Sequence, residues 1–155
     1  MQESGVGSVE LEEVVSLLGG REVLGGHPRT ALDAHDLLVR GLPGRCAYVL
    51  VKNLAYISQD ENLSRVLGMS HRTYQRKIDR PLELLSQEQS GRTWKFAEIL
   101  AKATAVFGSQ AGAEKWLQAP ATGLDRRRPI ELLATPAGVE LVEDHLTRLE
   151  YGVYA

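Results

Sequence analysis

The sequence predicts an all-α fold, a compact bundle of short helices. Apolar residues recur at helical spacing along most of the 155 residues, and capping signals stand before several of these stretches. Strand-like alternation is scarce, and CAYVLVKNLAYI is the only run that looks β-branched. The Pro43-Gly44 turn before that run, and the helical signals around it, favour a helix there as well.

In the first half of the chain, helices are expected on either side of glycine-rich turns. Val9–Leu18 reads as a helix that stops at Gly19-Gly20, and GGREVLGG reads as a flexible connection. Thr30 and Asp33 have a capping-box-like layout before AHDLLVRG, whose Gly41 suits a helix end. A further helix is expected to follow Pro43-Gly44 and to run through Leu54.

The second half carries clearer signals. Ser86 and Gln89 form a capping box before a long helix with one apolar stripe, which Gly108 ends. The stripe consists of Phe96, Ile99, Leu100, Ala103 and Phe107. Ser109 is expected to cap a short helix, and Pro129 suits the first turn of another. Thr135-Pro136 begins the last helix, which has Val139, Val142, Leu146 and Leu149 on one face.

Composition excludes several classes of protein. The net charge is −2, so any nucleic-acid binding must depend on a local basic patch. The single cysteine excludes an internal disulfide and fits a reducing cytoplasm, which is the localisation we expect. No run is long and apolar enough for a membrane span, and the polar, acidic N-terminus does not resemble a signal peptide.

Enzyme signals are largely missing. The chain has neither a phosphate-binding loop nor a G-x-G-x-x-G motif, and its four histidines are scattered without metal-ligand spacing. Cys46 reads as a small core residue, and the carboxylates read as solvated helix faces. Trp116 is expected in the core, whereas Trp94 is expected to be half exposed. We therefore expect no enzyme activity, no cofactor, no metal and no small-molecule substrate.

The segment DENLSRVLGMSHRTYQRKIDR, residues 60–80, has the layout of a helix-turn-helix. Gly68 lies in the turn, and Ser70 is the expected cap of the second helix. Leu63, Val66 and Leu67 are expected to pack the first helix, and Met69, Tyr74 and Ile78 the second. From Arg65 to Arg80 five basic residues stand against one acid, a local charge of +4.

These residue types suit DNA, because Arg pairs with guanine, Gln pairs with adenine, and a helix N-terminus binds phosphate. The expected DNA-binding residues are Ser70, His71, Arg72, Thr73, Gln75, Arg76 and Lys77. The competing interpretation is a solvated basic helix on an ordinary bundle.

The chain ends in RLEYGVYA, which is unusually apolar and aromatic for a terminus. Tyr151 and Tyr154 either fold back on their own bundle or insert into a partner. Gly152 suits a bend that leaves the last helix and directs Val153-Tyr154-Ala155 outward.

Several motifs in order resemble those of the Xre/MbcA/ParS antitoxins. They are the A-x-x-V-F-G helix end, the A-x-x-W-L-x-x-P step, the P-I-x-L-L helix, the T-x-x-G before the last helix and the terminal Y-G-V-x-A. These motifs cover residues 101–155. The preceding VLGMSHRTYQRKI resembles the Cro-like helix-turn-helix of the same family, so that the resemblance spans about residues 30–155.

This resemblance implies a dimeric antitoxin of a type II toxin–antitoxin pair, with a RES-domain toxin that consumes NAD⁺ as its partner. It implies an N-terminal extension (1–29), a helix-turn-helix domain (30–85) that binds operator DNA, and a C-terminal toxin-binding domain (86–155). The residues expected to bind the toxin and enter its active site are Arg148, Tyr151, Gly152, Val153, Tyr154 and Ala155.

Three questions stay open from the sequence. LDRRRP departs from the family pattern, and Arg126–Arg128 form either a solvated turn, which we favour, or a second phosphate or partner contact. Residues 1–29 are either a dimer element or a mobile arm. The alternative function is a stand-alone transcriptional regulator whose C-terminal domain only dimerises.

Overall fold

The computed structural model describes residues 2–152, with side chains described from Glu10 to Gly152. Within these residues the regular structure is helical, which confirms the all-α prediction. In chain order the helices are α1 (Gln2–Leu17), α2 (Gly20–Leu24), α3 (Ala31–Arg40), α4 (Gly44–Lys52), α5 (Leu63–Val66), α6 (His71–Asp79), α7 (Gln87–Phe107), α8 (Gln110–Gln118), the 3-10 turn η1 (Thr122–Leu124), α9 (Pro129–Leu132) and α10 (Pro136–Glu150).

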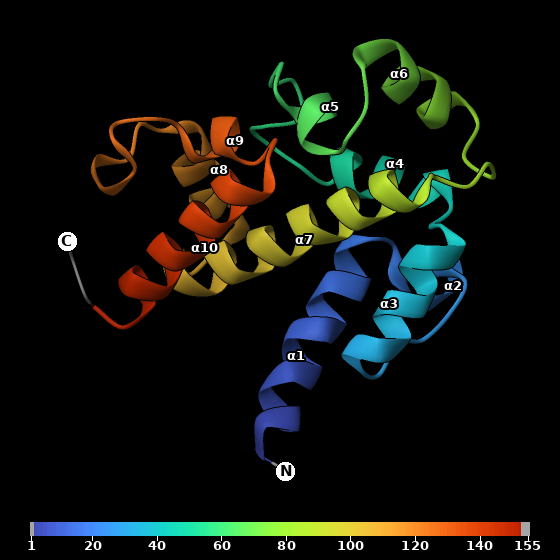
Figure 1. Cartoon of the computed structure of the whole chain (residues 1–155), viewed down its shortest axis with the longest axis horizontal. Helices are drawn as coiled ribbons and strands as arrows, with labels where there is room; N and C mark the ends of the chain where they lie inside the picture. The colour runs from blue at the N-terminus through green and yellow to red at the C-terminus, as the bar shows by residue number, and fades with distance from the viewer. Residues whose placement is uncertain (1, 153–155) are drawn as a thin grey trace.

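The long helix α7 is the axis of the fold (Figure 1). It packs against α1 and α3 on one side and against α8 and α10 on another, while α5 lies across it. At 21 residues it spans about 31 Å. Its start is the predicted capping box, in which Ser86 Oγ accepts the Gln89 N–H while the Gln89 side chain accepts the Ser86 N–H. Gly108 ends it with φ +85°.

The core of the bundle follows the predicted stripe along α7. Phe96, Ile99, Leu100 and Ala103 are buried, whereas Phe107 at the end of the stripe is partly exposed. Cys46 is completely buried, as predicted, and burial raises the pKa of its thiol to about 12. The run CAYVLVKNLAYI does contain a helix, α4, which ends at Lys52, and Leu54 is buried beyond that end.

Two local predictions were wrong. GGREVLGG is no irregular connection, because its centre forms α2, whose Leu24 is completely buried. The two tryptophans differ from the predicted exposure: Trp94, expected half exposed, is buried at 5 % exposure. Trp116, expected in the core, is half-buried between Phe107 and His145. Trp94 lies on the side of α7 that faces α1 and α3, so helices remote in sequence cover it.

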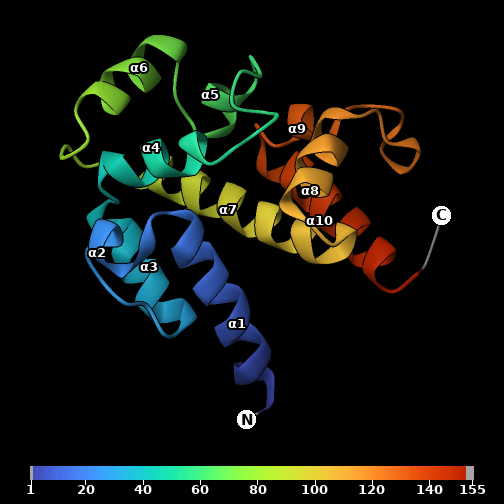
Figure 2. The ribbon, with the colours of Figure 1, turned by 180° about the vertical axis from the view of Figure 1, so that it is seen from behind.

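The helices that follow α3 lie over two different halves of α7. Figure 2 shows from behind that α4, α5 and α6 lie over one half of α7, while α8, α9 and α10 gather at the other half with the C-terminus. The predicted boundary between residues 85 and 86 falls at the cap of α7, a helix that contacts elements from both halves. None of the described helices is both long and apolar enough to cross a membrane.

Candidate functional site

The basic segment folds as the predicted helix-turn-helix. The first helix, α5, is a single turn, and Gly68 reverses the chain with φ +78° while Met69 N–H donates to Ser64 O at 2.9 Å. A Cβ atom at Gly68 would lie only 2.9 Å from Arg92 Cδ, so the turn has both a conformational and a steric need for glycine. Ser70 caps α6 by accepting the Thr73 N–H at 3.1 Å.

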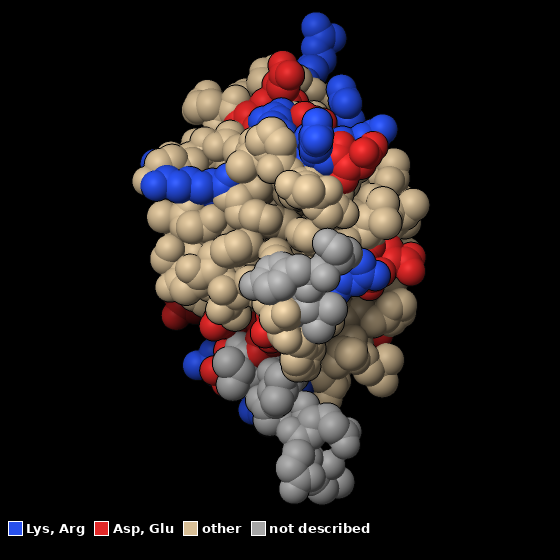
Figure 3. Space-filling model, turned by 90° about the vertical axis from the view of Figure 1, so that its left-hand side faces the viewer, with Lys and Arg blue, Asp and Glu red and all other residues tan. Residues whose placement is uncertain are grey.

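The outer face of α6 is free of the core. His71, Arg72, Gln75 and Arg76 are exposed, as is Ser70 at the helix start, and Thr73 is half-buried. Basic side chains, with some acidic ones among them, gather at the top of the molecule, the height at which α6 lies in Figure 1 (Figure 3). The structure therefore brings six of the seven predicted DNA-binding residues onto the start and accessible side of one helix.

Lys77 does not belong to this face. It lies three residues after the half-buried Tyr74, on the inward side of α6, and is only 8 % exposed. Its Nζ donates to Glu83 Oε1 at 2.8 Å and to Leu84 O at 3.0 Å. The hydrogen bond and charge of Lys77 lower the pKa of the Glu83 carboxyl. Lys77 thus fastens α6 to the loop before α7 instead of reaching outward.

Glu114 on α8 is a buried carboxylate that the sequence suggested was solvated. It is completely buried and accepts the backbone N–H groups of Ala55, Tyr56 and Ile57 at 3.2, 2.7 and 3.2 Å, together with Gln110 Nε2 at 3.0 Å. These amides lie in the loop that leads from α4 to the helix-turn-helix. No sequence signal pointed to the contact, because its partners are 57 to 59 residues away.

Asp60 makes a second link between the same loop and the C-terminal half. It accepts hydrogen bonds from Asn62 N at 2.9 Å and Gln118 Nε2 at 3.2 Å, and it pairs with Arg128 Nη1 at 3.1 Å. Burial alone would raise the pKa of Asp60, but the hydrogen bonds and the Arg128 charge outweigh it and the pKa is lowered. The loop that leads from α4 to the helix-turn-helix is therefore held by Glu114 and Gln118 of α8 and by Arg128 in the turn before α9.

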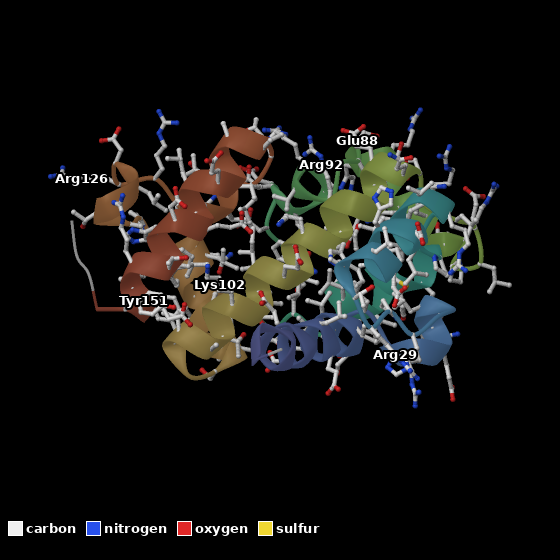
Figure 4. The ribbon with its side chains drawn as sticks, turned by 60° about the horizontal axis from the view of Figure 1, so that its bottom comes forward. Arg29, Glu88, Arg92, Lys102, Arg126 and Tyr151 are labelled. Carbon is white, nitrogen blue, oxygen red and sulfur yellow. The ribbon has the colours of Figure 1, made fainter. Side chains whose placement is uncertain are left out.

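Arg92 on α7 joins the same two halves from within the bundle (Figure 4). Its Nη1 donates to Ala134 O at 2.7 Å and to Arg65 O at 3.3 Å. One guanidinium thereby connects the end of α5 to the segment before α10.

The arginine turn, residues 125–128, is only partly the solvated turn that we favoured. Arg126 and Arg127 are exposed, but Arg128 pairs with Asp60 and with Glu131 Oε2 at 2.8 Å. Asp125 and Arg126 both have positive φ, +58° and +63°. Arg128 offers no side-chain cap to α9, as expected, and Pro129 occupies the first turn of that helix.

The described part of the chain ends just beyond α10, at Tyr151 and Gly152. Tyr151 is 74 % exposed, so it does not fold back on its own bundle, and Gly152 has the bend-compatible φ of +69°. Arg148 is also exposed, one turn earlier. Val153, Tyr154 and Ala155 lie outside the described residues. Beneath this end, the half-buried Trp116 stacks on His145 with ring centroids 5.9 Å apart.

Within the described residues, no cluster of three or more His, Cys, Asp or Glu side chains could hold a metal ion. Glu114, Asp60 and Arg92 are polar groups that link the two halves of the fold. Their arrangement leaves the basic helix α6 exposed at one end and the ring of Tyr151 exposed at the other.

The fold combines a helix-turn-helix with further helices at the C-terminal half of α7. Residues 33–98 match the model of the antitoxin Xre-like helix-turn-helix domain, and residues 102–152 match that of the antitoxin Xre/MbcA/ParS C-terminal toxin-binding domain. The chain belongs to the Xre-type antitoxin family.

Two curated relatives carry the same name, Antitoxin Xre. The protein from Pseudomonas putida is 33 % identical over 81 residues, which are 52 % of this chain and 50 % of the relative. The protein from Yersinia enterocolitica is 38 % identical over 69 residues, which are 44 % of this chain and 47 % of the relative. The chain spans about half the length of the curated relatives that it matches.

Proposed function

We propose that this chain is the antitoxin of a type II toxin–antitoxin pair and acts in the cytoplasm. In this proposal it binds its toxin through the C-terminal region, residues 86–155, and represses its own operon by binding operator DNA through α6. The family resemblance implies that the toxin is a RES-domain enzyme that consumes NAD⁺. The antitoxin itself acts by binding and carries no catalytic role.

The observation that carries the toxin-binding role is the exposed end of α10. Tyr151 is 74 % exposed beside a glycine with φ +69°, and so presents an aromatic ring for a partner to bury. In the proposal Tyr151 and the residues after it enter the active-site mouth of the toxin, with Arg148 beside them. Burial of the Tyr151 ring there contributes about 2 kcal/mol, or about thirtyfold in Kd.

Deletion of Tyr151–Ala155 tests this role. We expect the shortened chain to keep its circular dichroism spectrum and its operator binding, but to stop protecting cells from the toxin encoded beside it. Leu32→Ala is the matched control, because Leu32 is 69 % exposed on α3, away from the terminus. Neutralisation by the shortened chain would refute the active-site role of the terminus.

The DNA-binding role is supported by the exposed arginines of α6 and by the capped start of that helix. Arg72 and Arg76 lie one turn apart on the accessible face, where bidentate contact with guanine is geometrically available. Free N–H groups at the helix start suit a phosphate. Operators read by such helices usually have two half-sites, so the proposal includes a homodimer.

The double variant Arg72→Ala/Arg76→Ala tests the DNA-binding role. It should abolish specific retention of operator DNA while the helical circular dichroism stays unchanged. Arg21→Ala/Arg29→Ala removes two exposed arginines from the N-terminal part of the chain and serves as the control. Undiminished binding by the α6 variant would contradict the assignment.

The alternative is a stand-alone regulator whose C-terminal domain only dimerises. It makes no use of the exposed Tyr151, and it predicts that neither the full chain nor the chain shortened by Tyr151–Ala155 protects cells from the toxin. The protection assay on the full chain, beside the operator-binding assay, separates the two functions.

A further inference from the structure

We infer that Arg126 and Arg127 form a second contact with the toxin, an electrostatic one, and that it fits an acidic surface beside the pocket that receives the terminus. This inference rests on the proposed function and goes beyond it, because it assigns a role to the turn between η1 and α9. It also specifies the kind of surface that the toxin presents there.

The turn is held in one shape. Ala121 N–H donates to Arg127 O at 3.0 Å, and Arg126 N–H donates to Ala121 O at 2.8 Å, so both ends of the turn are tied together. Arg128, the next residue, is anchored by its ion pairs with Asp60 and Glu131. The two preceding arginines therefore project from a backbone that is already ordered, which lowers the entropy cost of a contact.

The backbone of the turn is also strained at one of these arginines. Arg126 has φ +63°, a left-handed conformation that is unfavourable for a residue with a Cβ and a long side chain. Arg126 and Arg127 are exposed, and the side chain of neither makes a hydrogen bond or salt bridge with another described residue. Backbone strain of this kind occurs often at positions that serve function.

The arginine turn and the terminus lie at the same end of the molecule. The loop between α8 and α9 and the end of α10 lie on the same side of the molecule in Figures 1 and 2, and Arg126 and Tyr151 lie at one end while Arg29 lies at the other (Figure 4). Contacts agree with the pictures, because η1 packs on α10 and Gly123 lies directly against His145, close to the helix end. A toxin bound over the terminus would therefore reach the turn.

The arginine side chains of the turn and their position indicate which ligand they bind. Arginine forks bind carboxylates and phosphates, so an acidic protein surface and a nucleic acid are both conceivable ligands. The basic helix α6 lies over the opposite half of the long helix α7, whereas Tyr151 lies at the same end as the arginine turn (Figure 4). This placement favours the carboxylates of the toxin.

A pair of glycine substitutions provides the test. Arg126→Gly removes an arginine and relieves its backbone strain, while Asp125→Gly relieves the neighbouring strain and removes no arginine. We expect each to raise Tm by about 2 °C. In calorimetric titrations with the toxin encoded beside this chain, Arg126→Gly should weaken affinity about two- to fivefold. Asp125→Gly should not weaken it, and the double variant Arg126→Ala/Arg127→Ala should reduce its salt dependence.

The outcomes separate the two proposals. If the unaltered chain binds the toxin and the arginine variants bind it equally well at low salt, the arginine contact is wrong and the antitoxin role stands. If the unaltered chain fails to bind the toxin, both are wrong. If the arginine variants keep toxin affinity but lose operator retention, the turn contacts DNA and the inference is overturned.

Discussion

Replacement of Glu114 is the most direct test of how the two halves of this chain are joined. Its carboxylate is completely buried and accepts the N–H groups of Ala55, Tyr56 and Ile57. Oε1 accepts two of these bonds, while Oε2 accepts the Ala55 bond and the one from Gln110. Glu114→Gln keeps the shape of the side chain, but its NH₂ group then faces donors on at least one side.

The expected cost follows from this geometry. Hydrogen bonds to a charged group contribute about 1.5–3 kcal/mol each, and a buried donor left unpaired costs about 1–3 kcal/mol. Because Glu114→Gln keeps part of the set, we expect it to lower the free energy of unfolding by about 2 kcal/mol. For a chain of this size that corresponds to a fall in Tm of about 4–8 °C. Glu114→Ala, which removes every bond, should cost about twice as much.

Urea unfolding followed by circular dichroism measures this cost, and amide hydrogen exchange at Tyr56 and Ile57 locates it. Exchange at these two amides should accelerate more than exchange along α7. Glu140→Gln is the matched control, since Glu140 is exposed on α10 and a surface change of this kind stays within about 0.5 kcal/mol. Equal stabilities of Glu114→Gln and Glu140→Gln would refute the reasoning.

Other consequences concern single side chains. The lowered pKa of Asp60 means that its stabilising contribution is present above the pKa of the unfolded chain, about 3.9, and is lost as pH falls through the folded value. In thermal melts below pH 4, the Tm of Asp60→Asn should therefore fall less steeply with decreasing pH than the Tm of the unaltered chain. Parallel pH profiles of the two proteins would contradict this. Cys46, buried with a pKa of about 12, should resist a thiol reagent in the folded chain and react in urea; prompt labelling of the native protein would count against its burial. Lys77→Met should lower stability by about 1–2 kcal/mol, since it breaks the pair with Glu83. Its operator affinity, measured by fluorescence anisotropy, should fall less than that of Arg76→Ala, and an equal loss would return Lys77 to the DNA-binding face.

Local signals predicted those parts of the fold that local contacts determine. Ser86 and Gln89, Ser70 and Thr135 each cap the helix that the sequence indicated, because a cap uses residues only three positions apart. α2 escaped prediction because flanking glycines suggest a connection. Burial of Leu24 helps to stabilise this helix, and the residues that bury it are not adjacent in sequence. The exchange of Trp94 and Trp116 has the same cause, since a helical stripe does not reveal which neighbours will cover it.

The candidate sites also differ in whether local signals predict them. The exposed face of α6 follows from helical periodicity, and the proposed toxin-binding role of the terminus comes from the family resemblance. Lys77 was predicted at the edge of the exposed face of α6 but is buried. Helical periodicity does not decide whether a long side chain at such an edge points to solvent or to the core. Glu114 and Asp60 had no local signature, since their partners come from distant parts of the chain.

The long helix α7 limits how far this protein can be dissected. Its buried side chains, including Trp94 and Phe96, are covered by helices from before and after it in sequence. A fragment that begins at residue 86 would keep the exposed terminus but would lose α1 and α3, and so present a bare apolar flank to solvent. On the proposed function, toxin specificity should be exchanged between relatives by replacing surface residues around Arg126 and Tyr151, and not by joining whole halves within α7.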